Sequence, residues 1–291
     1  DDNLESETGD DNLENGENNN SQDSIEEATS VEGDVPQDEA GPQDEKKDPT
    51  IPSLDNCDLS ELDLSDLSFV GISMQNANLT KTILNRANLS NVSLIKANMK
   101  NANLNDANLS EADLSDANLN QAILEDANLE GGTLDRANLS EVTLERANLR
   151  KCKFIESNLA KANLNEVTCG LADFSRSDLT NAKAIGADFN RVKLSGTNLN
   201  NVDFTDSRLS MAVFFEAKFI GTNLNRAQIK GSKLVKANFT DACLTRADLT
   251  GADLTGTILR GVDLSGVDLT GSILRGAILT GADLTGTILR G

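Results

Sequence analysis

From Leu54 onward, every fifth residue is a large apolar side chain, and this register runs to Leu289 without a slip. It contains 48 positions, of which 35 are Leu, eight Phe, two Met and one Ile, and only Cys169 and Ala184 are undersized. Two residues before each position stands a small side chain, most often Ala, and the other three positions are largely polar or Gly. We predict that the register forms the core, which includes Leu79, Leu104, Leu119, Phe154, Phe174 and Phe214.

A period of five fits neither regular element. On a helix that turns about 100° per residue, successive Leu side chains would lie about 140° apart and form no stripe. In a flat strand, side chains alternate with period two, so an odd step would send successive Leu residues to opposite faces. The chain must therefore turn within each repeat, which predicts a solenoid whose stability arises between adjacent coils.

The repeat units resemble those of the pentapeptide-repeat proteins, as in Ala77-Asn78-Leu79, Ala87-Asn88-Leu89 and Ala112-Asp113-Leu114. This resemblance covers residues 52–291. It implies an all-β fold, a right-handed quadrilateral β-helix with four repeats per coil and about twelve coils over residues 51–291. Residues n and n+20 would then stack. Asn columns such as Asn78, Asn98 and Asn118 are expected to hydrogen-bond along the rod without any ligand.

The first fifty residues differ sharply from the repeats. They hold 18 acidic residues and only Lys46 and Lys47, which gives a charge of −16 out of the −21 of the whole chain. With few large apolar side chains they cannot offset the entropy lost on ordering. We therefore predict a disordered acidic tail over residues 1–50, as either a solvating leader or a partner-binding arm, and a β-helix over residues 51–291.

The composition argues against catalysis and cofactor binding. The chain has no His, so it lacks the Ser-His-Asp and Cys-His pairs and the HExxH zinc site. We expect no enzyme, no cofactor and no metal site, and four free thiols. Cys57, Cys152 and Cys169 occupy positions of buried small hydrophobes, whereas Cys243 points outward and could be reactive.

No long apolar run occurs, so a membrane is not expected as a partner. The compartment is taken as the cytoplasm by default, with a thylakoid lumen or periplasm as alternatives if Asp1 is a processed end. Exposed aromatic residues for base stacking are missing, which makes nucleic-acid binding unlikely.

The sequence favours a role as a non-enzymatic protein-interaction or structural scaffold protein. The alternative is a DNA-mimicking inhibitor of a DNA topoisomerase (gyrase), since the resemblance extends to family members with that activity. Those members carry strongly acidic rods, whereas residues 51–291 here carry only −5.

Two candidate surfaces follow from the register. Phe215 is the one Phe outside the core positions, and with a 20-residue coil it stacks with Val235. We predict a protein-binding patch, with a Phe that merely covers a corner as the simpler alternative. The second surface is the last coil, which is expected to form a homodimer through its uncovered end. The patch comprises Val213, Phe215, Ile220 and Val235, and the end comprises Ile258, Ile273, Ile278 and Ile288.

Overall fold

Each five-residue repeat makes one side and one corner of a coil in the computed structural model, which describes residues 53–290. The corner is a turn closed by a hydrogen bond, as from the Ala77 N–H to the Met74 carbonyl oxygen at 3.2 Å. Asn76, the third residue of that turn, has a φ of 55°, and a positive φ at this position is typical of a type II turn. The recurring corner therefore explains the polar residues and Gly that fill these positions.

The side chain in the middle of each side also supports the corner that follows. The Thr80 backbone N–H donates to Asn78 Oδ1 at 3.2 Å, and the same contact recurs where Asp replaces Asn, as from the Ser265 N–H to Asp263 Oδ1 at 2.9 Å. Short side chains with a carbonyl or carboxylate oxygen make this contact without strain. This explains why Asn and Asp dominate the position before Leu.

Consecutive coils are joined by parallel bridges between residues n and n+20, such as Asn78 with Asn98. Two hydrogen bonds flank this bridge, from the Leu79 N–H to the Asn98 oxygen at 2.7 Å and from the Asn98 N–H to the Ala77 oxygen at 2.9 Å. One residue per side takes part, so the described residues contain isolated bridges and neither helices nor longer strands. The 20-residue spacing of these bridges confirms a β-helix with four repeats per coil.

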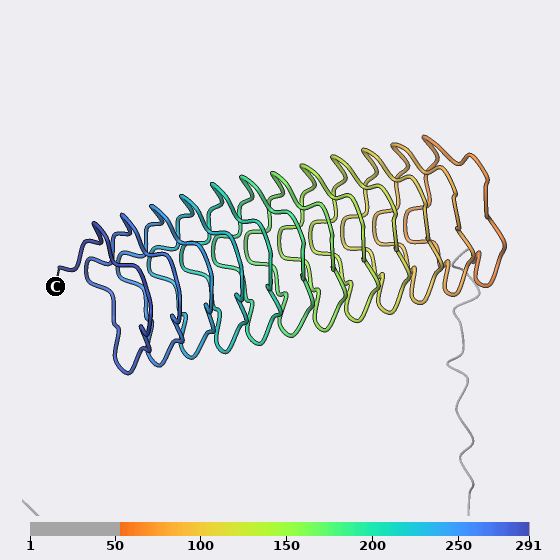
Figure 1. Cartoon of the computed structure of the whole chain (residues 1–291). Helices are drawn as coiled ribbons and strands as arrows, with labels where there is room; N and C mark the ends of the chain where they lie inside the picture. Colours follow the sequence, from red (N-terminus) through yellow and green to blue (C-terminus); the bar gives the residue numbers. More distant parts are fainter. Residues whose placement is uncertain (1–52, 291) are drawn as a thin grey trace, which may run out of the picture. The chain divides into compact units, whose positions relative to one another are not determined.

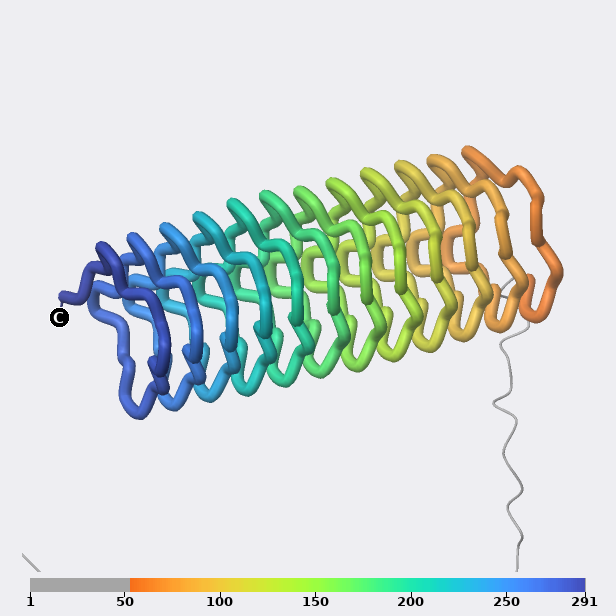
Figure 2. Tube along the Cα trace, in the orientation of Figure 1, coloured from red at the N-terminus to blue at the C-terminus, as the bar shows by residue number. Residues whose placement is uncertain are grey.

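The coils stack along one axis in sequence order and make a rod (Figures 1 and 2). At 20 residues per coil, residues 53–290 make about twelve coils. We number its four faces by their bridge residues. Face 1 holds residues 53, 73 and every twentieth residue to 273, face 2 runs from 58 to 278, face 3 from 63 to 283, and face 4 from 68 to 288. The predicted acidic tail, residues 1–50, lies outside the described residues.

The interior is a continuous stack of apolar layers. The core residues named from sequence are completely buried, namely Leu79, Leu104, Leu119, Phe154, Phe174 and Phe214. Around the small residue Ala184, three rings form a connected cluster: Phe189 lies 5.7 Å from Phe174 and 5.5 Å from Phe204 between ring centroids. Because protein interiors are close-packed, we infer that these rings occupy the space that Ala184 leaves in its layer.

The core positions are less buried at the two ends of the rod than in its middle. Leu54, Leu59 and Leu64 are only partly buried, and Leu289 is 59% exposed, because an end coil packs against one neighbouring coil instead of two. The same effect corrects one prediction: Cys57 occupies an inward position but is only half-buried.

Side-chain amides form ladders along faces 2 and 4. Asn118 Nδ2 donates to Asn98 Oδ1 at 3.0 Å, and Asn138 Nδ2 donates to Asn118 Oδ1 at 3.1 Å. The ladder predicted from sequence breaks at one step, where Asn98 Nδ2 donates to Thr80 Oγ1 at 2.9 Å. These contacts satisfy the amides within the protein, so the Asn columns need no ligand to explain them.

Candidate interaction faces

Several corners of the rod carry charges that compensate one another from coil to coil. Arg86 and Asp66 approach to 2.6 Å, Arg136 and Asp116 to 2.8 Å, and Arg226 and Asp206 to 2.5 Å. Hydrogen bonds from Arg86 and Arg226 lower the pKa of the Asp66 and Asp206 carboxyl groups. All these groups are exposed, so the pairs add little stability. Their main effect is to leave these corners without net charge.

The predicted patch is only partly assembled. Phe215 lies at the corner between faces 1 and 2, where 42% of it is exposed. The Glu216 N–H donates to the Val235 oxygen at 3.1 Å, so Val235 lies at the same corner one coil later. Val213 is the bridge residue of face 1 in the same coil as Phe215. These three residues are thus neighbours on adjacent coils, and we call them the face 1 patch.

Ile220 lies apart from this patch. It occupies the next corner, between faces 2 and 3, and Lys218 on face 2 stands between it and Phe215. The face 1 patch also has a basic neighbour, since Lys236 Nζ lies 5.5 Å from the centre of the Phe215 ring and 3.5 Å from Glu216 Oε1. A cation over an aromatic face is favourable, so Lys236 partly covers the ring.

The four C-terminal Ile residues are distributed around the rod. Ile258 and Ile278 form a bridge on face 2, whereas Ile273 lies on face 1 and Ile288 on face 4. Ile273, Ile278 and Ile288 are exposed, and Ile258 is half-buried. They therefore lie on three different faces and do not form one patch, whereas the core positions Leu284 and Leu289 are also exposed at this end.

Two exposed residues were missed in the sequence. Among the described residues, 33 non-glycine residues have a positive φ, and all but Leu171 and Met211 are polar or charged. These two side chains are 54% and 59% exposed. Both lie at the corner between faces 4 and 1, two coils apart. Their apolar side chains at corner positions were visible in the sequence, but their common column becomes evident only with a 20-residue coil.

The model for pentapeptide repeats matches this chain in eight copies between residues 53 and 286. The chain belongs to the pentapeptide-repeat family. Among solved structures, this pentapeptide-repeat protein is similar to HetL, which is involved in heterocyst differentiation regulation in the cyanobacterium Nostoc sp. strain PCC 7120. The identity is 31% over 80% of this chain and 90% of HetL, with a TM-score of 0.25.

Two further pentapeptide-repeat structures are similar to it. A protein from the Arabidopsis thaliana thylakoid lumen is 31% identical over 36% of this chain and 70% of its own, with a TM-score of 0.28. QnrB1, a plasmid-mediated fluoroquinolone resistance protein, is 18% identical over 77% of this chain and 90% of its own, with a TM-score of 0.37. Among curated proteins, no sequence matches the chain.

The thiols of this pentapeptide-repeat protein offer little chemistry. Burial raises the pKa of Cys152 to about 12, and its Sγ lies 2.9 Å from the Leu129 carbonyl oxygen. Burial also raises the pKa of Cys169, while Cys243 is half-buried with its Sγ 3.2 Å from Thr245 Oγ1. A raised pKa disfavours the reactive thiolate. Over residues 53–290, no cluster of three or more Cys, Asp or Glu is arranged to hold a metal ion.

Proposed function

We propose that this protein is a non-enzymatic interaction module that binds a protein partner through the face 1 patch. The proposal rests on the exposure of Phe215, of which 42% is accessible. Val213 and Val235 are its neighbours, and the core residues beneath them are completely buried. Exposed apolar clusters on otherwise polar surfaces often mark interfaces. A rigid support lowers the entropy lost on binding.

The polar composition of the rod supports a binding role over a catalytic one. Catalysis requires convergent polar groups in a concave, dry site. Here the interior is filled with Leu and Phe, and the polar side chains along the faces satisfy one another in ladders and ion pairs. Each carboxyl group with a resolved shift among the described residues has a lowered pKa, which does not suit a general acid.

Inhibition of DNA gyrase by DNA mimicry remains the alternative. A mimic needs a continuous acidic surface, whereas residues 131–240 hold 16 basic and 11 acidic residues. The middle of the rod is therefore positive, at +5. We consequently favour a partner that binds the apolar patch, and a gyrase supercoiling assay distinguishes the two functions.

The test places a photoreactive benzoyl-phenylalanine at position 215 and crosslinks the protein in extract of its source cells. The partner found by mass spectrometry is then purified and its affinity is measured against Phe215→Asp. Asp135 occupies the same corner in an earlier coil, so the variant is expected to fold. Ile155→Asp, also in that column, adds the same charge away from the patch and is the matched control.

We expect Phe215→Asp to weaken partner binding at least about tenfold, while Ile155→Asp binds like the unmodified protein. Equal affinity of the two variants would exclude the face 1 patch as the binding surface. Inhibition of supercoiling by the purified protein would favour the gyrase alternative.

A further inference from the structure

One corner of the rod differs from the other three in both charge and polarity. At the corner between faces 4 and 1, the residues with positive φ run Lys151, Leu171, Arg191, Met211 over four consecutive coils. We call these four residues the ridge. With adjacent coils about 4.8 Å apart, cations and apolar side chains alternate over a length of about 14 Å. Away from the ends of the rod, Leu171 and Met211 are its most exposed large apolar side chains.

More cations flank the ridge than its acids can neutralise. Arg150 and Lys230 adjoin it in the same corner column, Lys153, Lys193 and Lys233 lie on face 1, and Arg208 lies on face 4. The acidic neighbours are already paired: Glu130 with Lys151 at 2.8 Å, Asp173 with Lys193 at 3.3 Å, and Asp188 with Arg208 at 3.2 Å. Among the described residues, Arg150, Lys153, Arg191, Lys230 and Lys233 form no ion pair.

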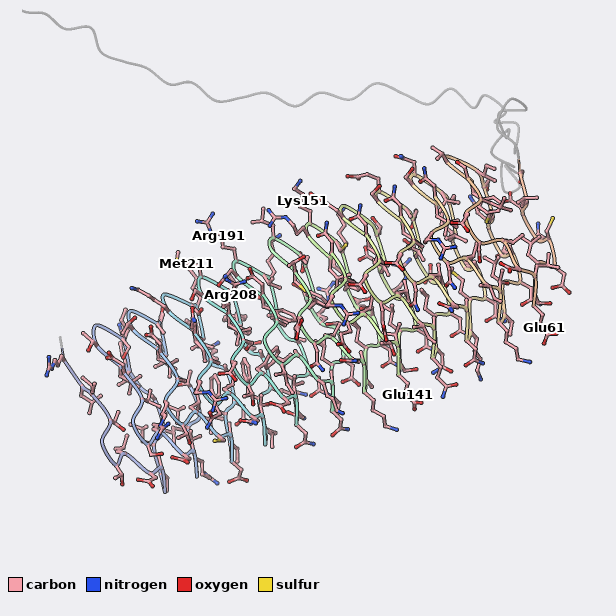
Figure 3. The ribbon with its side chains drawn as sticks, turned by 90° about the horizontal axis from the view of Figure 1, so that it is seen from above. Glu61, Glu141, Lys151, Arg191, Arg208 and Met211 are labelled. Atoms are coloured by element: carbon pink, nitrogen blue, oxygen red, sulfur yellow. The ribbon has the colours of Figure 1, made fainter. Side chains whose placement is uncertain are left out.

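The ridge projects from the rod. Figure 3 shows Lys151, Arg191 and Met211 along one edge with Arg208 beside them, and Glu61 and Glu141 along the opposite edge. Lys161 pairs with Glu141 at 3.5 Å on that opposite edge. An exposed, straight, positively charged edge with apolar tips is therefore confined to one side of the middle coils.

We propose that the ridge is a docking surface for an anionic membrane, on which the rod lies with this edge against the lipid headgroups. Lys and Arg are attracted by acidic headgroups, and the Leu171 and Met211 side chains reach the boundary between headgroups and acyl chains. No long apolar run is needed for such a peripheral contact. In the described residues, no helix is long and apolar enough to cross a membrane.

A membrane fits these observations better than other anionic partners. A straight, convex edge can touch a plane along its whole length, whereas a protein partner would need a matching groove. The ridge contains no aromatic side chain on which the bases of a single-stranded nucleic acid could stack. Aliphatic tips among cations are instead the combination found in interfacial membrane binding.

The test is co-sedimentation of the full chain with vesicles of phosphatidylcholine and phosphatidylserine in about equal parts, against vesicles of phosphatidylcholine alone. The full chain is required because its acidic first fifty residues belong to the charge balance. Each cation near an anionic surface strengthens binding by about fivefold, so Arg191→Gln with Lys230→Gln should weaken it about 25-fold. Leu171→Ser with Met211→Ser should weaken it at least about tenfold.

Lys161→Gln on the opposite edge is the matched control and should bind like the unmodified protein. Circular dichroism verifies that each variant is folded, which is expected because all substituted side chains are exposed. Binding that requires phosphatidylserine and decreases with salt supports the proposal. Absence of vesicle binding, or equal binding of all variants, would overturn it. The face 1 patch is unchanged in these variants, so partner capture through Phe215 is tested separately.

Discussion

Replacing Ala184 by Leu is expected to destabilise the rod, and Phe189→Leu in the same molecule is expected to relieve most of that effect. Ala184 is completely buried and stands where nearly all other repeats have a large side chain. Phe189 is the next core residue in the same coil, with ring contacts to Phe174 and Phe204. If these rings occupy the space that Ala184 leaves, a Leu at position 184 has no room until a ring becomes smaller.

The magnitudes follow from packing. Overfilling a core costs about 1–3 kcal/mol, which is the expected effect of Ala184→Leu alone. Phe189→Leu alone loses two aromatic contacts of about 0.5–1.5 kcal/mol each, hence about 1–3 kcal/mol. Because the double variant restores a layer of more ordinary composition, its loss should fall short of the sum by at least about 1 kcal/mol.

The assay is urea denaturation followed by circular dichroism on the two single variants and the double variant. Long repeat arrays can lose cooperativity, so the dependence of the unfolding free energy on urea must be equal among the variants. The control pairs Ala184→Leu with Phe239→Leu. Phe239 is equally buried and stacks on Phe219 at 4.3 Å, but it lies almost three coils away, so these two effects should add. If Ala184→Leu and Phe189→Leu also add within about 0.5 kcal/mol, the two residues do not share space and the reasoning is wrong.

Three other outcomes are expected. Hydrogen bonds lower the pKa of Asp66, Asp116 and Asp206 below the usual 3.8. The stability that these carboxylates contribute is therefore present above about pH 4 and lost on further acidification. A melting temperature that does not fall from pH 5 to pH 2 would contradict this. Deletion of residues 1–50 removes none of the 48 core positions and should change the melting temperature by no more than a few degrees. The 291-residue chain, which exposes Leu284 and Leu289 in its last described coil, should give a dimer mass in light scattering at micromolar concentration, and polar coils appended after Gly291 should yield a monomer.

The inward and outward positions could be predicted from sequence because one period runs through the whole rod. Leu79 and Phe214, more than a hundred residues apart, are buried by the same rule. The size of the coil could not be predicted in this way. The period of five requires a turn in each repeat but does not determine how many repeats close one coil. Four per coil followed from the family resemblance, and the Asn columns followed from that number.

Surface features were predicted less well because they depend on neighbours twenty residues away and on the ends of the rod. Phe215 and Val235 lie at one corner in adjacent coils, whereas Ile220, which was grouped with them from the sequence, lies at the next corner. Leu171 and Met211 were overlooked because the corners were considered repeat by repeat, and the alternation with Arg191 is evident only when one corner is followed from coil to coil. Cys57 was taken as buried because the pattern does not indicate that, among the described residues, the first coil packs against one other coil only.

Since four repeats close one coil, the number of residues between two side chains on this rod sets both the angle between them about the rod axis and their distance along it. Five residues inserted anywhere would leave each later Leu inward but rotate every downstream side chain by a quarter circle. Twenty inserted residues would return every downstream side chain to its original angle about the axis and lengthen the rod by only about 4.8 Å. Gain or loss of whole repeats can thus rotate one surface relative to another without any substitution in the core. The number of repeats therefore determines the relative orientation of two binding surfaces on the rod.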